Sequence, residues 1–161
     1  MKECSGKKCL LSFLAVYAFM LSYEIFEHSI LLARLYKASA TVWRPVTDMD
    51  HLSTWYLVHT ALLALLFCVL YKGYSCNVSE KNMADSKYCP FKQSIPYGIK
   101  IGLIMGVLAS RSYTWIPMHM NVAMAWFFGG LAEGVGIGLM LGLTSRKKTG
   151  NCGDKTGSCG S

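Results

Sequence analysis

The sequence lacks a recognisable catalytic motif. It contains no nucleophile elbow, no phosphate-binding loop, no dinucleotide-binding fingerprint and no H-E-x-x-H pair. It also lacks a polar stretch long enough to form a second, water-soluble domain. These absences make an enzyme the least favoured class, and we predict that the protein is not an enzyme.

Long apolar stretches are what the sequence does contain. A helix needs ~20 mostly apolar residues to cross a hydrocarbon core of ~30 Å. Four stretches reach or approach this length: Leu10–Tyr36, Trp55–Tyr71, Tyr97–Ser110 and Met118–Leu143. The sequence therefore predicts an all-α fold, a polytopic membrane protein built as an antiparallel bundle of four transmembrane helices.

The basic residues predict how this bundle is oriented. The chain is 53% hydrophobic yet has a net charge of +7, so the charge must lie in the connections between spans. Twelve of the 16 Lys and Arg fall on the side of the two termini and the middle connection. Because basic residues accumulate on the cytoplasmic side, both termini are predicted to be cytoplasmic. The same pattern explains the positive charge without nucleic-acid binding, and no nucleic-acid partner is expected.

These patterns divide the chain into three parts. Residues 1–9 form a cytoplasmic N-terminal segment, and residues 10–145 form the transmembrane domain, with a cytoplasmic loop at 75–94. Residues 146–161 are rich in Gly, Ser, Lys and Asp, which predicts a disordered cytoplasmic tail.

The seven cysteines are concentrated in the predicted cytoplasmic segments. Cytoplasmic thiols stay reduced, and the spacing does not match the C-x-x-C pairs of common zinc sites. Ordinary reduced thiols are favoured, while a soft-metal or redox role and disulfides stay open as alternatives. Six of the cysteines occur as pairs, namely Cys4 and Cys9, Cys76 and Cys89, and Cys152 and Cys159.

Small residues recur every four positions in the third and fourth spans. Such ridges allow the backbones of two helices to approach closely, which is how helices associate in lipid. We therefore predict that these two helices pack through glycine faces. The residues are Gly98, Gly102, Gly106 and Ser110 in the third span and Gly130, Gly134, Gly138 and Gly142 in the fourth.

Five ionisable residues lie well inside the spans: Glu24, Glu27, His28, His59 and Glu133. Each costs ~2.5–3.5 kcal/mol on insertion scales, so such residues usually face protein or water and often mark function. The first three are spaced i, i+3 and i+4 and share a helix face. The helical rise of ~1.5 Å per residue gives His28 and His59 a similar depth. We predict a polar track that descends from the outer surface.

This track is open to several chemical interpretations. Carboxylates and imidazoles suit a proton relay or a cation route. Glu24, His28 and His59 are also candidate metal ligands, since imidazole with carboxylate is a usual first coordination shell. A haem held by His28 and His59 is a weaker alternative, and no cofactor is favoured. The plainest alternative is that these side chains only form hydrogen bonds between helices.

Three features together resemble a known group of proteins. They are Glu24 with His28, the segment Ala38-Ser39-Ala40-Thr41-Val42-Trp43-Arg44-Pro45, and the segment Trp126-Phe127-Phe128-Gly129-Gly130-Leu131-Ala132-Glu133. They resemble an uncharacterised family of small bacterial four-helix integral membrane proteins, over most of residues 10–145. The resemblance implies the bacterial inner membrane as location and brings no established activity.

Two functional hypotheses follow. The first is proton or cation permeation or sensing through the Glu/His track, by a protein that is a homo-oligomer or part of a larger membrane complex. The second is a non-catalytic accessory subunit that packs through its glycine faces against a larger complex. Geometry separates them, because a route requires the five ionisable groups to converge on a water-accessible cavity, whereas a subunit can scatter them.

Overall fold

The computed structural model describes residues 6–39, 42–43, 52–81 and 90–145. Most residues in these ranges are helical and none forms a strand, so the prediction of an all-α fold is confirmed for this part. The long elements are α1 (Gly6–Phe26), α4 (Ser53–Lys81), α5 (Pro90–Arg111) and α6 (Met120–Thr144). Shorter elements are a π-helix η1 (Glu27–Leu31), α2 (Ala33–Ala38) and a 3-10 turn η4 (Ser112–Thr114).

Three of the helices are long and apolar enough to cross a membrane. These stretches are Cys9–Leu31, Ser53–Ser75 and Met120–Thr144. The remaining predicted span, Tyr97–Ser110, does form a helix, since it lies within α5, of 22 residues. Its apolar residues are diluted by Gln93, Ser94 and Lys100 in its first half, and it does not reach the same hydropathy.

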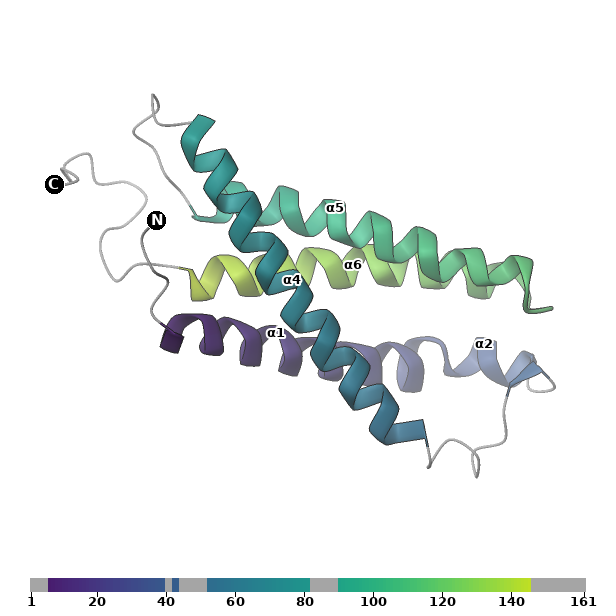
Figure 1. The fold of residues 1–161 in the computed structure, drawn as a ribbon. Helices are drawn as coiled ribbons and strands as arrows, with labels where there is room; N and C mark the ends of the chain where they lie inside the picture. Colours follow the sequence, from purple (N-terminus) through teal and green to yellow (C-terminus); the bar gives the residue numbers. More distant parts are fainter. Residues whose placement is uncertain (1–5, 40–41, 44–51, 82–89, 146–161) are drawn as a thin grey trace, which may run out of the picture.

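The long helices alternate in direction (Figure 1). Helices α1, α5 and α6 run roughly along one axis, and α5 and α6 lie side by side. Helix α4 crosses α1 obliquely. The start of α1 and the end of α6 lie at the same end of the bundle.

The predicted glycine faces lie at the contact between α5 and α6. A Cβ atom placed on Gly98 would be 2.5 Å from the carbonyl oxygen of Gly134, and one on Gly106 would be 2.5 Å from the carbonyl oxygen of Phe127. Both obstacles are backbone atoms, which cannot rotate away. The glycines in tight contact between α5 and α6 are Gly98, Gly102, Gly106, Gly130, Gly134, Gly138 and, against Ser94 and Phe91, Gly142.

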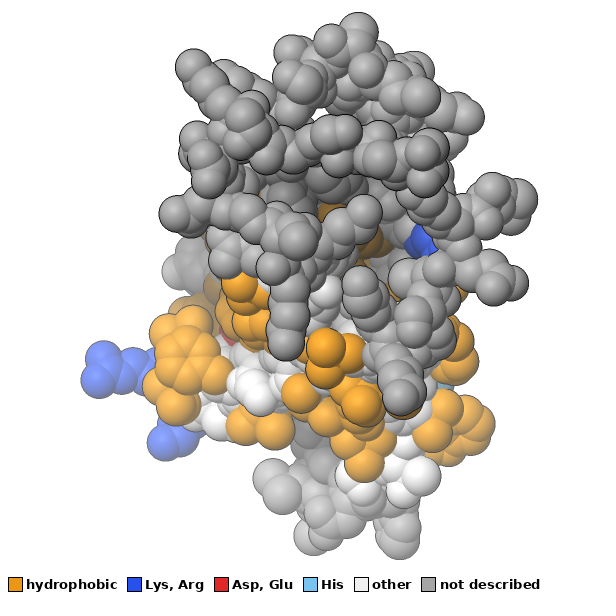
Figure 2. Space-filling model, turned by 90° about the vertical axis from the view of Figure 1, so that its left-hand side faces the viewer, with side chains coloured by type: hydrophobic (Ala, Val, Ile, Leu, Met, Phe, Trp, Pro, Cys, Tyr) orange, Lys and Arg blue, Asp and Glu red, His pale blue; other side chains and the backbone are white. Residues whose placement is uncertain are grey.

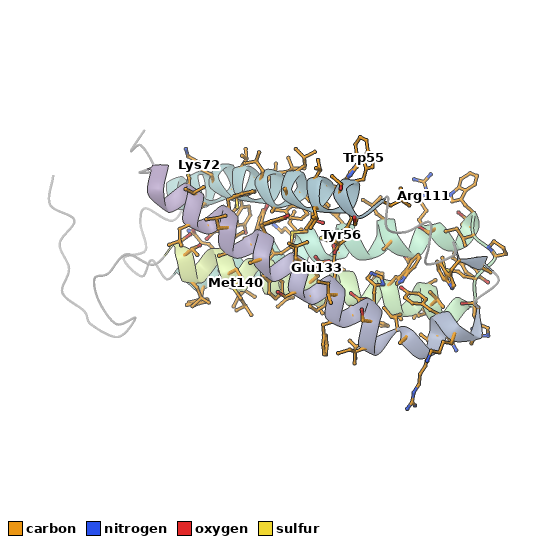
Figure 3. The ribbon with its side chains drawn as sticks, turned by 90° about the horizontal axis from the view of Figure 1, so that it is seen from below. Trp55, Tyr56, Lys72, Arg111, Glu133 and Met140 are labelled. Carbon is orange, nitrogen blue, oxygen red and sulfur yellow. The ribbon has the colours of Figure 1, made fainter. Side chains whose placement is uncertain are left out.

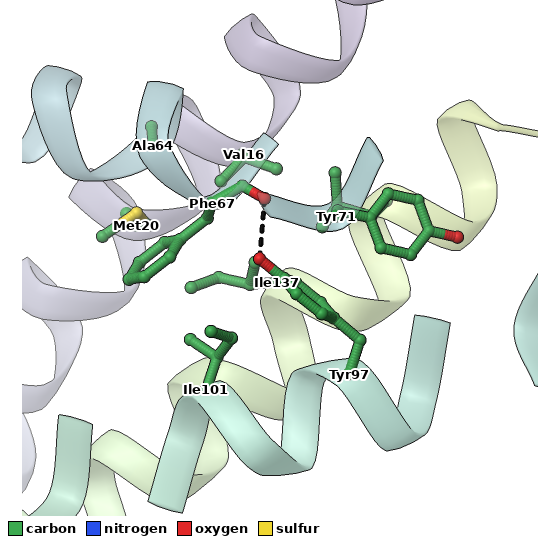
Figure 4. Packing of buried hydrophobic residues seen from close by; sticks show 9 residues of the cluster. Val16, Met20, Ala64, Phe67, Tyr71, Tyr97, Ile101 and Ile137 are labelled. Carbon is green, nitrogen blue, oxygen red and sulfur yellow. Dashed lines mark hydrogen bonds between the residues drawn. The ribbon is translucent and has the colours of Figure 1, made fainter. Parts of the chain in front are cut away.

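A hydrophobic cluster joins all four long helices (Figure 4). Tyr97 of α5 donates its hydroxyl hydrogen to the carbonyl oxygen of Phe67 in α4 at 2.7 Å. This bond fixes α4 against α5 where the two helices cross. The buried residues are Val16 and Met20 of α1, Ala64, Phe67 and Tyr71 of α4, Tyr97 and Ile101 of α5, and Ile137 and Leu141 of α6.

The outward surface of the bundle is apolar, which suits a membrane environment. Among the described side chains of α4, those that are buried form a narrow stripe, Thr60, Ala64, Phe67 and Tyr71, while most of the other large ones, such as Leu62, are exposed. Figure 2 views the molecule from the end that holds the termini, and there too the side chains of the described residues are mainly hydrophobic, with few Lys or Arg visible. Apolar surface of this extent is expected where helices face lipid.

Two boundaries differ from the sequence prediction. The loop predicted at 75–94 is too long, because α4 continues to Lys81 and α5 begins at Pro90. Residues 75–81 and 91–94, over which the two helices extend into the predicted loop, contain no proline. Pro90 suits the first position of a helix, where the backbone N–H that proline lacks would have no intrahelical partner. The first span is also not one continuous helix, since α1 gives way to η1 at Glu27 and α2 begins at Ala33.

The predicted N-terminal segment and tail lie largely outside the described residues. Helix α1 begins at Gly6, inside the predicted segment 1–9, and residues 146–161 are outside the described part altogether. Among the cysteines, the structure describes the side chains of Cys9, which is exposed, and Cys68, which is half-buried; both are free thiols. The reduced state predicted for the other five cysteines stays a prediction.

Candidate functional site

The first span changes its helical geometry at two of the predicted site residues. The backbone N–H of Leu32 donates to the carbonyl oxygen of Glu27 at 2.9 Å, a bond that spans five residues instead of four. This widened turn holds Glu27 and His28. Turns of this π type are rare and occur frequently at functional sites. They shift the side chains that follow relative to those of the preceding α-helix.

Four of the five predicted track residues line one cavity. The cavity has a volume of about 380 Å³ and lies between the end of α1 with η1, the C-terminal end of α5 with η4, and α6. A volume of this size falls in the usual range for small-molecule sites. Its lining consists of Glu24, Glu27 and His28 from the first span, Met105, Ala109 and Ser112 from α5 and η4, and Trp126, Gly130 and Glu133 from α6.

Glu133 is the most isolated polar group of the cavity. Its side chain is only 4% exposed, and its Oε1 has no hydrogen-bond partner. Figure 3 shows it in the middle of the bundle, far from Lys72 and Arg111 at the two ends. A buried polar atom without a partner is costly and calls for an explanation, such as a water or an ion.

Glu24 of α1 is hydrogen-bonded to helix α4, which crosses α1. Tyr56 of α4 donates its hydroxyl hydrogen to Oε2 of Glu24. Figure 3 shows Tyr56 near the middle of the bundle, in the same region as Glu133. The sequence analysis missed Tyr56. The sequence signal for Tyr56 is its spacing, because it stands four residues before Thr60 and eight before Ala64. It therefore shares a helix face with the stripe that α4 buries.

Glu27 occupies space that a glycine leaves free. Its side chain is 6% exposed, and a Cβ atom on Gly129 of α6 would collide with its Oε1. The neighbouring Tyr23 donates its hydroxyl hydrogen to the carbonyl oxygen of Gly129 at 3.1 Å, which holds α1 and α6 in register here. The absence of a side chain at position 129 is thus what allows a carboxylate to lie against the α6 backbone.

His28 belongs to a chain of hydrogen bonds beside the cavity, formed with Tyr36 and Trp126. The indole N–H of Trp126 donates to the hydroxyl oxygen of Tyr36 at 2.7 Å, and that oxygen lies 2.5 Å from Nδ1 of His28. The Tyr36 hydroxyl can donate its hydrogen to Nδ1 of His28 when that ring nitrogen carries none. The ring of Trp43 contacts both Tyr36 and Trp126.

His59 does not join the other four residues. It is exposed on α4, with Nδ1 2.7 Å from the carbonyl oxygen of Trp55, and it does not line the cavity. The sequence prediction places His59 with His28 because the helical rise gives both residues a similar depth in the membrane. Depth is not sufficient, because α4 crosses the bundle obliquely and turns Tyr56, not His59, toward the first span.

The residues predicted to bind a metal ion or a haem do not come together in the structure. Within the described ranges, no three His, Cys, Asp or Glu side chains lie close enough to hold a metal ion. Glu24 and His28 line the cavity while His59 is apart, so the pairs required for a metal or a bis-histidine haem do not assemble there.

Ion pairs do not neutralise the three carboxylates either. In the part of the chain that the structure describes, Glu24, Glu27 and Glu133 form no ion pair with a Lys, Arg or His side chain. Among the described residues, no Lys or Arg side chain lines the cavity, and His28 is the one basic group in its lining. Because neighbouring carboxylates repel one another, ionisation of all three needs a cation beside them, and otherwise at least one of them holds a proton.

Comparison of the chain with protein-family models, with curated proteins and with solved structures finds no match. The resemblance to small bacterial four-helix membrane proteins therefore stays a prediction, and the site is interpreted from its own geometry.

Proposed function

We propose that this membrane protein binds protons and monovalent cations at the cavity of Glu24, Glu27 and Glu133, and that it serves proton or cation permeation or sensing. The observation on which the proposal depends is Glu133. A carboxyl group that is 4% exposed, with an unpartnered oxygen at a cavity it shares with two further carboxylates, is costly unless a cation or proton occupies the site.

The convergence of side chains favours this function over that of an accessory subunit. A subunit that merely packs against a larger complex can leave its ionisable groups as separate hydrogen-bonded pairs. Here four groups from two regions of the sequence line one cavity, and a π turn lies at two of them. Only His59 is scattered.

We further propose that α5 crosses the membrane with the other three long helices, that both chain ends are cytoplasmic, and that the bundle assembles as an oligomer or in a larger complex. The twelve-to-four distribution of basic residues supports the orientation. A reporter that is active only in the cytoplasm should be active when fused after Ser161 and silent when inserted near Asp48. The opposite pattern would overturn the orientation.

Proton flux tests the function. The full chain is reconstituted into vesicles that contain a pH-sensitive dye, and the membrane potential is set with potassium and valinomycin. We expect proton entry above that of empty vesicles. Glu133→Gln keeps the shape of the side chain but removes its charge, so it should lower the flux at least about tenfold, as expected for a group essential to an intramembrane site.

Glu80→Gln is the matched control, since Glu80 lies in α4 beyond the apolar stretch Ser53–Ser75. It should leave the flux unchanged. Equal flux in the wild type and in Glu133→Gln would contradict the proposal, and so would the absence of both proton flux and proton binding in the wild type.

A further inference from the structure

A second cavity lies on the other side of Glu27. Its volume is about 290 Å³, and it runs between the first span and α6. Apart from Glu27 and the hydroxyl of Tyr23, its lining is apolar or backbone. The lining residues are Tyr23, Glu27, Leu31, Leu32, Leu35, Ala125, Phe128, Gly129 and Ala132.

Glu27 is the one residue that lines both cavities. Its carboxyl group therefore lies between the acidic cavity and this apolar groove. Gly129 makes that position possible, because a side chain there would displace the carboxyl group. A molecule in the groove reaches Glu27 without passing the outer end of the bundle.

The rim of the groove lies on the apolar outer surface. Phe128 is 57% exposed and Leu31 is 58% exposed, and both line the groove. Each belongs to a helix that is long and apolar enough to cross a membrane. In a bilayer this rim faces lipid chains, so the groove is an opening toward the hydrocarbon and not toward water.

We propose that the groove admits an amphiphilic ammonium ion from the bilayer, with its charged head at Glu27 and its hydrocarbon chain along Leu31, Ala132 and Phe128. This inference rests on the proposed function and names the cation. Charge complementarity selects the head group, because Glu27 is buried, acidic and free of any ion pair in the described ranges. The apolar walls accommodate the chain, which stays in an apolar environment as it passes from the bilayer into the groove.

The same features disfavour other occupants. A bare metal ion finds no set of three ligands among the described residues. A neutral lipid chain gains nothing from the carboxylate at the end of the groove. An ammonium ion bound at Glu27 is also at the edge of the acidic cavity, where Glu24 and Glu133 supply further negative charge.

Binding of a homologous series of ligands tests the inference. The full chain is placed in lipid nanodiscs, and saturable binding of radiolabelled hexylammonium, methylammonium and 1-hexanol is measured, with empty nanodiscs subtracted. Hexylammonium should bind at least about tenfold more tightly than either of the others, because only it uses both the carboxylate and the apolar walls.

Two variants separate these contributions. Glu27→Gln should weaken the binding of hexylammonium at least about thirtyfold, the lower end of the effect of removing one member of a buried charge pair. Ala132→Leu narrows the groove and should weaken hexylammonium but leave methylammonium unchanged. Ala18→Leu is the matched control, since Ala18 is exposed on α1 and lines neither cavity.

Equal binding of hexylammonium and methylammonium, or hexylammonium binding that Ala132→Leu leaves unchanged, would overturn this inference. Neither result touches the proposed function, which depends on Glu133. If the wild-type protein shows neither proton flux nor proton binding, the proposed function itself is overturned.

Discussion

Helices α5 and α6 touch backbone to backbone, whereas the first span and α4 meet their neighbours through long side chains and leave space between them. In the first region a Cβ on Gly130 would be 2.8 Å from the backbone nitrogen of Gly106, so nothing can be added. In the second, Tyr56 reaches across to Glu24 beside a cavity of about 380 Å³. Rigid packing on one side thus supports an open, acidic site on the other.

The largest effect is expected in the closely packed region. In Gly134→Ala the new Cβ would collide with the Cα and N atoms of Gly102, which are backbone atoms and cannot rotate away. We expect a loss of roughly 3 kcal/mol in the free energy of unfolding, the upper end of the usual cost of overpacking. Thermal unfolding in detergent measures it.

Gly73→Ala is the matched control, because a Cβ there has no neighbour within 4 Å. It should be neutral or stabilise the protein by up to about 1 kcal/mol, as Ala does relative to Gly inside a helix. Equal melting temperatures for the two variants would show that α5 and α6 do not pack through their glycine faces.

A smaller effect is expected where α4 joins the bundle. Tyr97→Phe removes the hydroxyl that donates to the carbonyl oxygen of Phe67 at 2.7 Å and keeps the ring in place. The expected loss is about 1 kcal/mol, the net contribution of one hydrogen bond. Tyr113→Phe, at an exposed tyrosine, should change nothing. If Tyr97→Phe lowers the free energy of unfolding as much as Gly134→Ala does, the contact of α4 with α5 is as rigid as that of α5 with α6.

The smallest change in stability is expected for substitutions of His28 and His59. Their effect on the pH dependence of proton flux distinguishes the two residues. His28→Ala removes the cavity-lining partner of Tyr36 and should alter the pH dependence of proton flux between about pH 5 and 8, where histidine normally titrates. His59→Ala should leave the pH profile unchanged, since His59 is exposed and bonded to its own helix. If the two variants exchange these outcomes, the route passes along α4 and not through the cavity.

The extent of prediction from sequence differs between the same two regions. The glycine faces could be predicted because helical periodicity alone places Gly98, Gly102 and Gly106 on one side. The site was predicted only in part. Glu24, Glu27 and His28 share a face by spacing, and Glu133 is conspicuous as a charge in an apolar helix.

What could not be predicted depends on how helices cross. His59 was grouped with His28 by depth, but the oblique path of α4 brings Tyr56 to the first span instead. The π turn at Glu27 has no signature in the local sequence, and without it the position of Glu27 against Gly129 could not be foreseen. Tyr36 and Trp126 are 90 residues apart, and only the folded chain joins them.

Proton release on cation binding tests the central claim most directly. Methylammonium chloride is added to the purified full chain in weakly buffered detergent solution, and the change in pH is recorded. If Glu24, Glu27 and Glu133 share one site that holds either protons or a cation, the wild type releases protons and Glu133→Gln releases markedly fewer, while Glu80→Gln behaves as the wild type. No release from the wild type, or equal release from Glu133→Gln, would contradict the account.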